Sequence, residues 1–207
     1  MIFVTGGTGL VGAHILLKLS QQSRDFKALK RKSSSMDVCR NIFRYYKGEH
    51  LFSKINWVDG DVNDIFSLEA GMKGCDLLLH CAGIVSFQRS DLELLQKVNI
   101  EGTANLMNIA LNMGIRKVGF VSSIAALGRK STVGMIDEET HFKVAKLDSN
   151  YALSKYLSEQ EVWRASAEGL DVVIINPSVI LGPGDWTKGS SQIFEKIYKG
   201  LKFYTTG

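Results

Sequence analysis

The strongest constraint on this chain is a set of three evenly spaced glycines, Gly6, Gly9 and Gly12, near the N-terminus. They follow an apolar segment, residues 2–5, that predicts a β-strand, and they open a stretch, residues 10–19, whose apolar residues have helical spacing. Glycines here permit a tight turn, the close approach of a pyrophosphate and tight packing of helix on strand, and the helix N-terminus offers N–H groups to the anion. The spacing therefore predicts a dinucleotide-binding loop rather than a purely structural turn, with contacts from Gly6, Thr8, Gly9, Leu10, Val11 and Gly12.

The rest of the chain alternates between strand-like and helix-like segments. Further strands are predicted over 26–30, 56–59, 77–81, 117–122 and 171–176, and helices over 36–47, 65–72, 91–113 and 150–168. Repeated β–α units of this kind imply an α/β fold, a Rossmann-like doubly wound parallel sheet with helices on both faces. The chain leaves the sheet at Pro177 and Pro183, and residues 124–147 look irregular and functional. We expect an NAD(P)-binding domain over 1–180 and the beginning of a substrate-binding region over 181–207.

Composition narrows the functional classes. The formal net charge is +4 and 45% of the residues are hydrophobic, which suits a globular protein with anionic small-molecule ligands better than a nucleic-acid-binding protein. No apolar run reaches the length of a membrane span, and the N-terminus lacks the basic region of a signal peptide. The three cysteines have no metal-binding spacing and indicate reduced thiols. We expect a cytoplasmic protein without a metal site and without nucleic-acid or membrane partners.

A basic cluster at the end of the second predicted strand bears on the identity of the dinucleotide. NAD-binding folds often place an acidic residue there to hold the ribose hydroxyls, whereas this chain has Lys30, Arg31 and Lys32. Positive charge at this point suits the 2′-phosphate of NADP, although a solvated basic loop gives the same sequence. We therefore expect NADP(H) as the preferred cofactor and NAD(H) as the alternative. Asp61, after the third predicted strand, either contacts the adenine or caps the helix that begins near Ile65.

Tyr151 and Lys155 lie one turn apart on the same face of a predicted helix. A free tyrosine has a pKa near 10, and a neighbouring ammonium together with a positively charged nicotinamide ring would lower it. The phenol could then exchange a proton with a substrate hydroxyl or carbonyl. A tyrosine and a lysine at this spacing arise readily by chance, so the functional interpretation depends on where the pair lies in the predicted fold. This helix follows the fifth strand, and catalytic groups of open α/β sheets gather beyond the carboxyl ends of the strands.

A serine pair, Ser122 and Ser123, ends the fifth predicted strand at that same edge. Ser123 could hydrogen-bond the substrate oxygen and polarise it, while a strand-end turn is the structural alternative. His80 ends a buried apolar strand, and we expect a core histidine with satisfied hydrogen bonds rather than a catalytic base. Asn99, in the helix after the fourth strand, is either a helix-surface amide or a buried organiser of the active site.

Several segments, in order over nearly the whole chain, resemble the extended short-chain dehydrogenase/reductase family, also called the NAD-dependent epimerase/dehydratase superfamily. Residues 5–12 are similar to its cofactor loop, and residues 98–103 to its "N-x-x-G-T" helix. Residues 61–62 resemble its adenine-contacting pair, 80–83 a segment beside the cofactor, and 176–184 the segment that lines the nicotinamide and substrate sites. The resemblance implies further cofactor contacts from Asp61, Val62, Ala82, Gly83, Asn99, Lys155 and Pro177. It also implies a catalytic set of Ser123, Tyr151 and Lys155, with Ser123 preferred over Ser122 for its spacing from Gly128.

Two details resemble the dihydroflavonol-reductase and 3β-hydroxysteroid-dehydrogenase-like branch of that family. Arg31 is similar to the branch's NADP-selecting arginine, and the run Pro-Ser-Val-Ile-Leu-Gly-Pro-Gly over 177–184 resembles the branch as well. Nucleotide-sugar epimerases more often have a tyrosine where Leu127 stands. Family members are usually much longer, and their C-terminal part closes over the substrate. We therefore expect the C-terminal substrate part to be largely absent from this chain.

The residues and the resemblance together predict an NADP(H)-dependent oxidoreductase that interconverts a carbonyl and a hydroxyl on a small-molecule substrate by hydride transfer, with Tyr151 as the acid/base. One alternative is a nucleotide-sugar epimerase/dehydratase that uses bound NAD(P) and the same residues. A second is a non-catalytic dinucleotide-sensing protein, which the presence of Tyr151 and Lys155 disfavours. The apolar faces of the helices over 91–113 and 150–168 favour a homodimer through these two helices.

Overall fold

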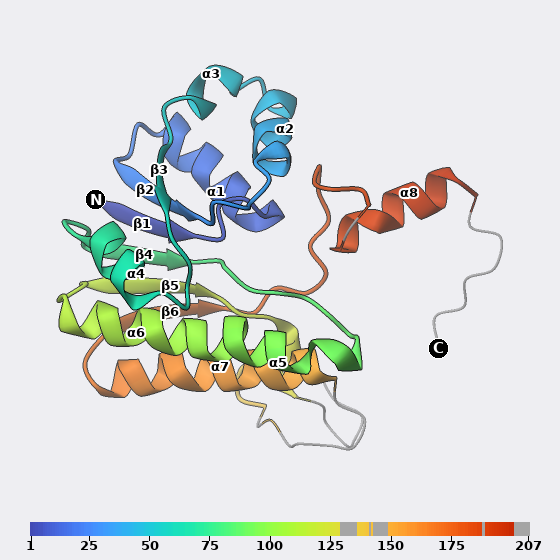
Figure 1. The fold of residues 1–207 in the computed structure, drawn as a ribbon. Helices are drawn as coiled ribbons and strands as arrows, with labels where there is room; N and C mark the ends of the chain where they lie inside the picture. The colour runs from blue at the N-terminus through green and yellow to red at the C-terminus, as the bar shows by residue number, and fades with distance from the viewer. Residues whose placement is uncertain (129–135, 141, 143–148, 188, 201–207) are drawn as a thin grey trace.

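A single parallel sheet organises the molecule (Figure 1). The computed structural model describes residues 1–128, 136–140, 142, 149–187 and 189–200. Within them the strand order is β3-β2-β1-β4-β5-β6, and every pairing is parallel. The strands are β1 (Ile2–Thr5), β2 (Phe26–Lys30), β3 (Asn56–Asp59), β4 (Leu77–His80), β5 (Lys117–Val121) and β6 (Asp171–Ile175). This is the order of a doubly wound dinucleotide-binding sheet, whose switch point lies between β1 and β4, and it confirms the predicted fold class.

Helices cover both faces of this sheet. The chain forms α1 (Leu10–Gln21), α2 (Asp37–Tyr45), α3 (Glu49–Phe52), α4 (Ile65–Met72), α5 (Leu92–Leu95), α6 (Gly102–Asn112), α7 (Asn150–Ala167) and α8 (Gln192–Tyr198). In Figure 1, α1, α2 and α3 lie on one side of the sheet, and α4, α5, α6 and α7 lie on the other. Short 3₁₀ turns are η1 (Arg89–Asp91), η3 (Ile124–Leu127) and η4 (Gly189–Ser191).

The long helical region predicted over 91–113 is present, but it is not one uniform α-helix. A wider π-helical segment, η2 (Gln96–Glu101), separates α5 from α6. At its centre, the backbone carbonyl of Asn99 accepts hydrogen bonds from the hydroxyls of Thr103 at 2.5 Å and Ser158 at 2.7 Å. Insertions of this kind often mark functional sites. The helix predicted over 36–47 also ends early, at Tyr45. The predicted irregular stretch 124–147 lies mainly outside the described residues.

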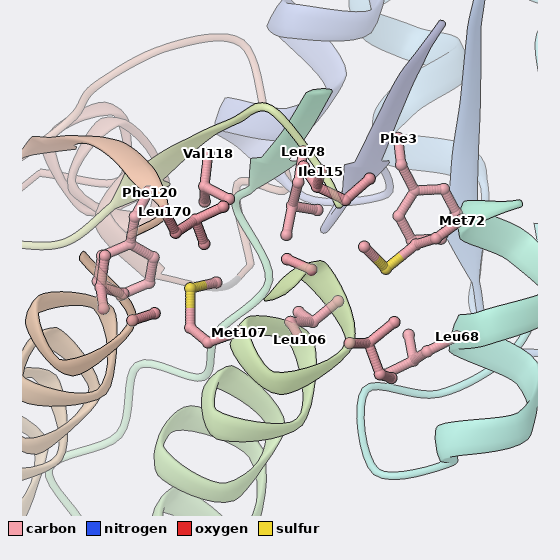
Figure 2. Close-up of a cluster of buried hydrophobic side chains, with 14 of the residues drawn as sticks. Phe3, Leu68, Met72, Leu78, Leu106, Met107, Ile115, Val118, Phe120 and Leu170 are labelled. Carbon is pink, nitrogen blue, oxygen red and sulfur yellow. The ribbon is translucent and has the colours of Figure 1, made fainter. Parts of the chain in front are cut away.

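Two apolar clusters bind the helices to the sheet. On the α1 and α2 side the cluster includes Val4, Leu16, Ala28, Ile42 and Phe43. On the α4, α6 and α7 side it includes the residues labelled in Figure 2: Phe3, Leu68, Met72, Leu78, Leu106, Met107, Ile115, Val118, Phe120 and Leu170. Because both faces are covered, the central strands carry apolar residues almost throughout, which is why their sequence reads as continuous apolar runs.

The second cluster gives a direct test of packing. Ile115 is 4% exposed within it, whereas Ile65, at the start of α4, is 47% exposed. Ile115→Val is expected to lower the free energy of unfolding by about 0.5–1.5 kcal/mol because it removes a buried methylene. The matched Ile65→Val variant is expected to stay within about 0.5 kcal/mol of wild type. Urea unfolding followed by circular dichroism measures both, and equal losses in the two variants would contradict the packing described.

The segment beyond β6 leaves the sheet and reaches α8, which lies apart from the other helices in Figure 1. No residue of α8 is buried. In the part of the chain that the structure describes, no helix combines the length and the apolar character needed to cross a bilayer.

Candidate active site

The glycine loop connects β1 to α1 at the carboxyl edge of the sheet. Gly6 has φ +72°, and a Cβ there would lie 2.5 Å from the backbone carbonyl of Cys81, so only glycine fits without strain. A Cβ on Gly12 would collide with the carbonyl oxygen of Gly6. Gly9 differs, because its Cβ would meet only ordinary contact, 3.5 Å from that same oxygen. Contacts within the protein therefore explain why positions 6 and 12 carry glycine, but they do not explain why position 9 does.

The N-terminus of α1 is arranged to receive an anion. Gly9 is its N-cap, no side chain caps the helix, and no acidic residue occupies the first turn. The first N–H groups of a helix and its dipole favour a phosphate when no side chain satisfies them. Leu10 and Val11 follow on α1 and line a groove of about 530 Å³ together with Ile180 and Pro183. The segment after β6 thus lies against the start of α1, next to the glycine loop.

The basic cluster after β2 divides into paired and exposed charges. The ammonium of Lys30 forms an ion pair with Asp59, the last residue of β3, and this pairing lowers the pKa of the Asp59 carboxyl. Arg31 and Lys32 are exposed at the end of β2. The ion pair between Asp59 and Lys30 was not predicted from the sequence. Arg31 and Lys32 therefore remain as exposed positive charges directly after β2.

The alternative role of Asp61 as a helix cap is wrong. The N-cap of α4 is Asp64, whose carboxylate accepts a hydrogen bond from the backbone N–H of Ser67. Asp61 instead accepts from the backbone N–H of Asn63 at 2.9 Å, which holds the turn after β3. Val62 is buried, 7% exposed, and its backbone carbonyl accepts a hydrogen bond from the Asn105 amide at 3.1 Å.

His80, at the end of β4, is a core histidine, as predicted. Its Nδ1 accepts from the hydroxyl of Thr5 at 2.7 Å, and its Nε2 donates to the hydroxyl of Thr103 at 3.0 Å, which in turn donates to the carbonyl of Asn99. We assign this tautomer because the Thr103 hydrogen is already given to that carbonyl. Burial lowers the pKa of His80 to about 3, so the ring is neutral. The Thr5 hydroxyl also accepts from the backbone N–H of Ala82 at 3.2 Å, which fixes the chain after β4.

Asn99 is the buried organiser, not a helix-surface amide. It is 2% exposed, and its amide donates to the carbonyl of Ile84 at 3.0 Å and to the hydroxyl of Ser154 at 2.9 Å, while its oxygen accepts from the Ile84 N–H. The Ser154 hydroxyl continues to the carbonyl of Tyr151 at 2.8 Å. Both amide hydrogens are used within the protein, so Asn99 orders the loop around Gly83 and the start of α7 rather than donating to a cofactor.

Ser123 and Tyr151 come together although they are far apart in the chain. Their side chains form a hydrogen bond, and Ser123 also caps η3 by accepting from the N–H of Ala125 at 3.2 Å. The structural alternative for Ser123, a strand-end turn, is therefore present alongside the contact with Tyr151. The ring of Phe87, 73% exposed, lies edge-on to the Tyr151 ring with centroids 5.7 Å apart. No sequence signal pointed to Phe87.

Lys155 is buried, 5% exposed, one turn after Tyr151 on α7. Its ammonium donates to the carbonyl of Val121 at 3.0 Å and lies 4.5 Å from the ring centroid of Phe120. Burial lowers the pKa of Lys155 to about 8. The expectation that Lys155 lowers the pKa of Tyr151 is not met. Burial raises the pKa of Tyr151, and the hydrogen bond from Ser123 offsets part of that rise.

Residues after β6 close the site from the other side. The amide of Asn176 donates to the backbone carbonyl of Ser123 at 3.1 Å, and the carbonyl of Pro177 accepts from the N–H of Ile124 at 3.1 Å. Sequence reasoning missed Glu159, a buried carboxylate two turns after Tyr151 on the same helix. The signal was present as an acidic residue one turn beyond Lys155 on the same face.

Comparison with known proteins agrees with this arrangement. A model of the NAD dependent epimerase/dehydratase family matches residues 2–206. A protein of Synechocystis sp. described as "Putative dihydroflavonol 4-reductase" is 40% identical over 183 residues, which make up 88% of this chain and 50% of that protein. A UDP-glucose 4-epimerase of Vibrio cholerae is 29% identical over 192 residues, 88% of this chain and 52% of that protein. This chain spans about half the length of the curated relatives it matches.

Solved structures give the same result. A short-chain dehydrogenase/reductase superfamily protein from Agrobacterium tumefaciens with bound NAD is 25% identical, with a TM-score of 0.68 over 85% of this chain and 48% of that one. The first relative is a reductase by its description, in line with the expected branch. The family match covers nearly the whole chain, and the sheet order and glycine loop have the corresponding form. The chain belongs to the NAD-dependent epimerase/dehydratase family, the extended type of short-chain dehydrogenase/reductase.

Proposed function

We propose that the protein is an NADP(H)-dependent oxidoreductase that interconverts a carbonyl and a hydroxyl group on a small-molecule substrate. The observation that carries the proposal is that Ser123, at the end of β5, lies beside Tyr151 of α7, one turn from the buried Lys155. These residues follow the end of β5, and the glycine loop follows the end of β1, so both lie at the same edge of the parallel sheet. The similarity to a protein described as a reductase supports the same class of reaction.

The proposed mechanism assigns one task to each residue. A bound nicotinamide cofactor supplies or accepts the hydride. Ser123 donates a hydrogen bond to the substrate oxygen and polarises it. In reduction, the Tyr151 hydroxyl gives its proton to that oxygen, and in oxidation the phenolate takes the proton back. The raised pKa of Tyr151 keeps the phenol protonated at neutral pH, which suits the reductive direction. Lys155, one turn after Tyr151 on α7, would hold the ribose of the bound cofactor.

The dinucleotide fits the residues at the glycine loop. Gly9 has no contact in the protein that would exclude a methyl group, so its lack of a side chain is explained by a ligand that approaches the backbone closely. The uncapped N-terminus of α1 lies directly behind it. Arg31 and Lys32 support NADP over NAD because each exposed cation can pair with the additional 2′-phosphate.

The Arg31→Asp variant tests this cofactor preference. We expect the wild type to bind NADPH more tightly than NADH, and the variant to lose about tenfold or more in affinity for NADPH, because a charge-assisted hydrogen bond to phosphate contributes about 1.5–3 kcal/mol. Affinity for NADH should change little. Fluorescence titration at fixed ionic strength measures both constants. Arg24→Asp carries the same charge change before β2, at the opposite edge of the sheet, and controls for net charge. Equal wild-type affinities for the two cofactors would reject the assignment of Arg31.

A nucleotide-sugar epimerase or dehydratase is the second candidate. The 29% identity to a UDP-glucose 4-epimerase favours it, and the same three residues would serve that chemistry. Such an enzyme returns the hydride to its own substrate. Purified protein that retains tightly bound NAD(H), and converts a nucleotide sugar without net cofactor turnover, would support this candidate over the reductase.

A further inference from the structure

Glu159 is a buried carboxylate in the same helix as Tyr151 and Lys155. It is 8% exposed, and it accepts hydrogen bonds from the Ser122 hydroxyl at 2.6 Å, the Asn176 amide at 2.9 Å and the Trp163 indole at 3.3 Å. All three partners are neutral donors. The cost of burying a charge suggests that this carboxylate has a role beyond packing.

The first role that the contacts support is positional. Ser122 follows β5, Asn176 follows β6, and Glu159 belongs to α7, so a single carboxylate joins three elements where they meet. The same Asn176 amide that bonds to Glu159 also donates to the backbone carbonyl of Ser123. Glu159 therefore fixes the Asn176 side chain, which in turn fixes the backbone of Ser123. Loss of the carboxylate would free Asn176 and, through it, the backbone that carries the Ser123 hydroxyl.

The second role concerns the charge that faces Lys155. Four titratable groups lie near Lys155: His80 at the end of β4, Cys81 directly after it, and Tyr151 and Glu159, one turn before and one turn after Lys155 on α7. Burial lowers the pKa of His80 to about 3 and raises that of the Cys81 thiol to about 12, and it also raises the pKa of Tyr151. Three of the four are therefore neutral between roughly pH 6 and 9. Among the described residues, Glu159 is the negative charge that opposes the desolvation of Lys155 in this range.

We propose that Glu159 is a positioning residue of the candidate active site, whose carboxylate both anchors Ser123 through Asn176 and supplies the counter-charge for the buried Lys155. The proposal deepens the proposed function and rests on it for its biological meaning. Its physical content, the coupling between Glu159 and Lys155, can be measured without cofactor or substrate. The pH dependence of Lys155 is the readout, because a carboxylate that only filled space would not change it.

The experiment follows the lysine side-chain carbons of the cofactor-free protein by NMR as a function of pH. Lys155 should titrate well below the surface lysines, and its signal is assigned by its absence from the Lys155→Met spectrum. In Glu159→Gln the midpoint of Lys155 is expected to move to lower pH, because the favourable negative charge is gone. Glu161→Gln is the matched control, since Glu161 lies on the same helix but pairs with Arg164 on its outer side at 2.9 Å. It should leave the Lys155 midpoint in place.

A second measurement needs no variant at position 159, in case Glu159→Gln does not fold. In the wild type, the carboxyl carbon of Glu159 should show an inflection at the pH where Lys155 loses its proton, and the carboxyl carbon of Glu161 should not. An unchanged Lys155 midpoint in folded Glu159→Gln, or the absence of that inflection, overturns the proposal. Failure of the wild type to bind NADPH and NADH would instead reject the proposed function and leave the coupling between Glu159 and Lys155 intact.

Discussion

The Tyr151→Phe variant is expected to reduce carbonyl substrates about a hundredfold to ten-thousandfold more slowly than the wild type, which is the usual contribution of one general acid–base group. Phenylalanine keeps the ring and its edge-on contact with Phe87, and it removes only the hydroxyl that bonds to Ser123. The loss should therefore fall on turnover and not on cofactor affinity. Oxidation of NADPH with a panel of aromatic and aliphatic aldehydes and ketones measures turnover, and fluorescence titration measures binding.

Tyr156→Phe is the matched control for this variant. Tyr156 lies on the same helix, five residues later, and its ring stacks on Phe142 with centroids 4.3 Å apart. The same loss of a hydroxyl there should leave turnover within about twofold of the wild type. Undiminished activity in Tyr151→Phe would remove Tyr151 from the mechanism. A parallel loss of NADPH binding in that variant would show that the hydroxyl supports the site structurally and would leave the acid unassigned.

Much of the fold could be predicted from the sequence because parallel strands buried on both faces are short apolar runs. Residues 2–5 and 77–81 show this, and their predicted bounds agree with β1 and, to within one residue, with β4. The division of the helical region 91–113 into α5, η2 and α6 could not be predicted, because the apolar periodicity continues through it. Its π-helical segment depends on hydroxyls from Thr103 and Ser158, and Ser158 lies 59 residues away from the carbonyl of Asn99 that it bonds. Local periodicity holds no information about a partner so distant.

The candidate site shows the same division. Ser123, Tyr151 and Lys155 were predictable because each stands at a fixed place relative to a strand end or a helix turn. Glu159 was not identified, because an acidic residue in a helix usually faces solvent, and its burial depends on donors from Ser122 and Asn176. The direction of the Tyr151 pKa shift was also not predicted. Burial raises this pKa, and the burial of a side chain in the packed site cannot be deduced from residue spacing.

Alanine at the glycine loop should separate folding from ligand binding. A Cβ on Gly12 would collide with the carbonyl oxygen of Gly6, and neither group can move without shifting β1 or α1. Gly12→Ala is therefore expected to lower the free energy of unfolding by about 3 kcal/mol or more, at the upper end of overpacking effects. Gly9→Ala meets only ordinary contacts at φ −92°, and its stability should stay within about 1 kcal/mol of the wild type.

Gly9→Ala, the variant with the smaller expected loss of stability, should nevertheless lose affinity for the cofactor. A methyl group on Gly9 stands at the N-terminus of α1, where the pyrophosphate is proposed to approach the backbone, so Gly9→Ala should fold normally and lose about tenfold or more in NADPH affinity, or about 1.4 kcal/mol. Urea unfolding and fluorescence titration on the same samples measure the two quantities. Wild-type affinity in folded Gly9→Ala would place the diphosphate elsewhere, because no contact within the protein accounts for that glycine. Wild-type stability in Gly12→Ala would show that the loop can relax, and the close approach of the Gly6 carbonyl would then no longer explain why position 12 carries glycine.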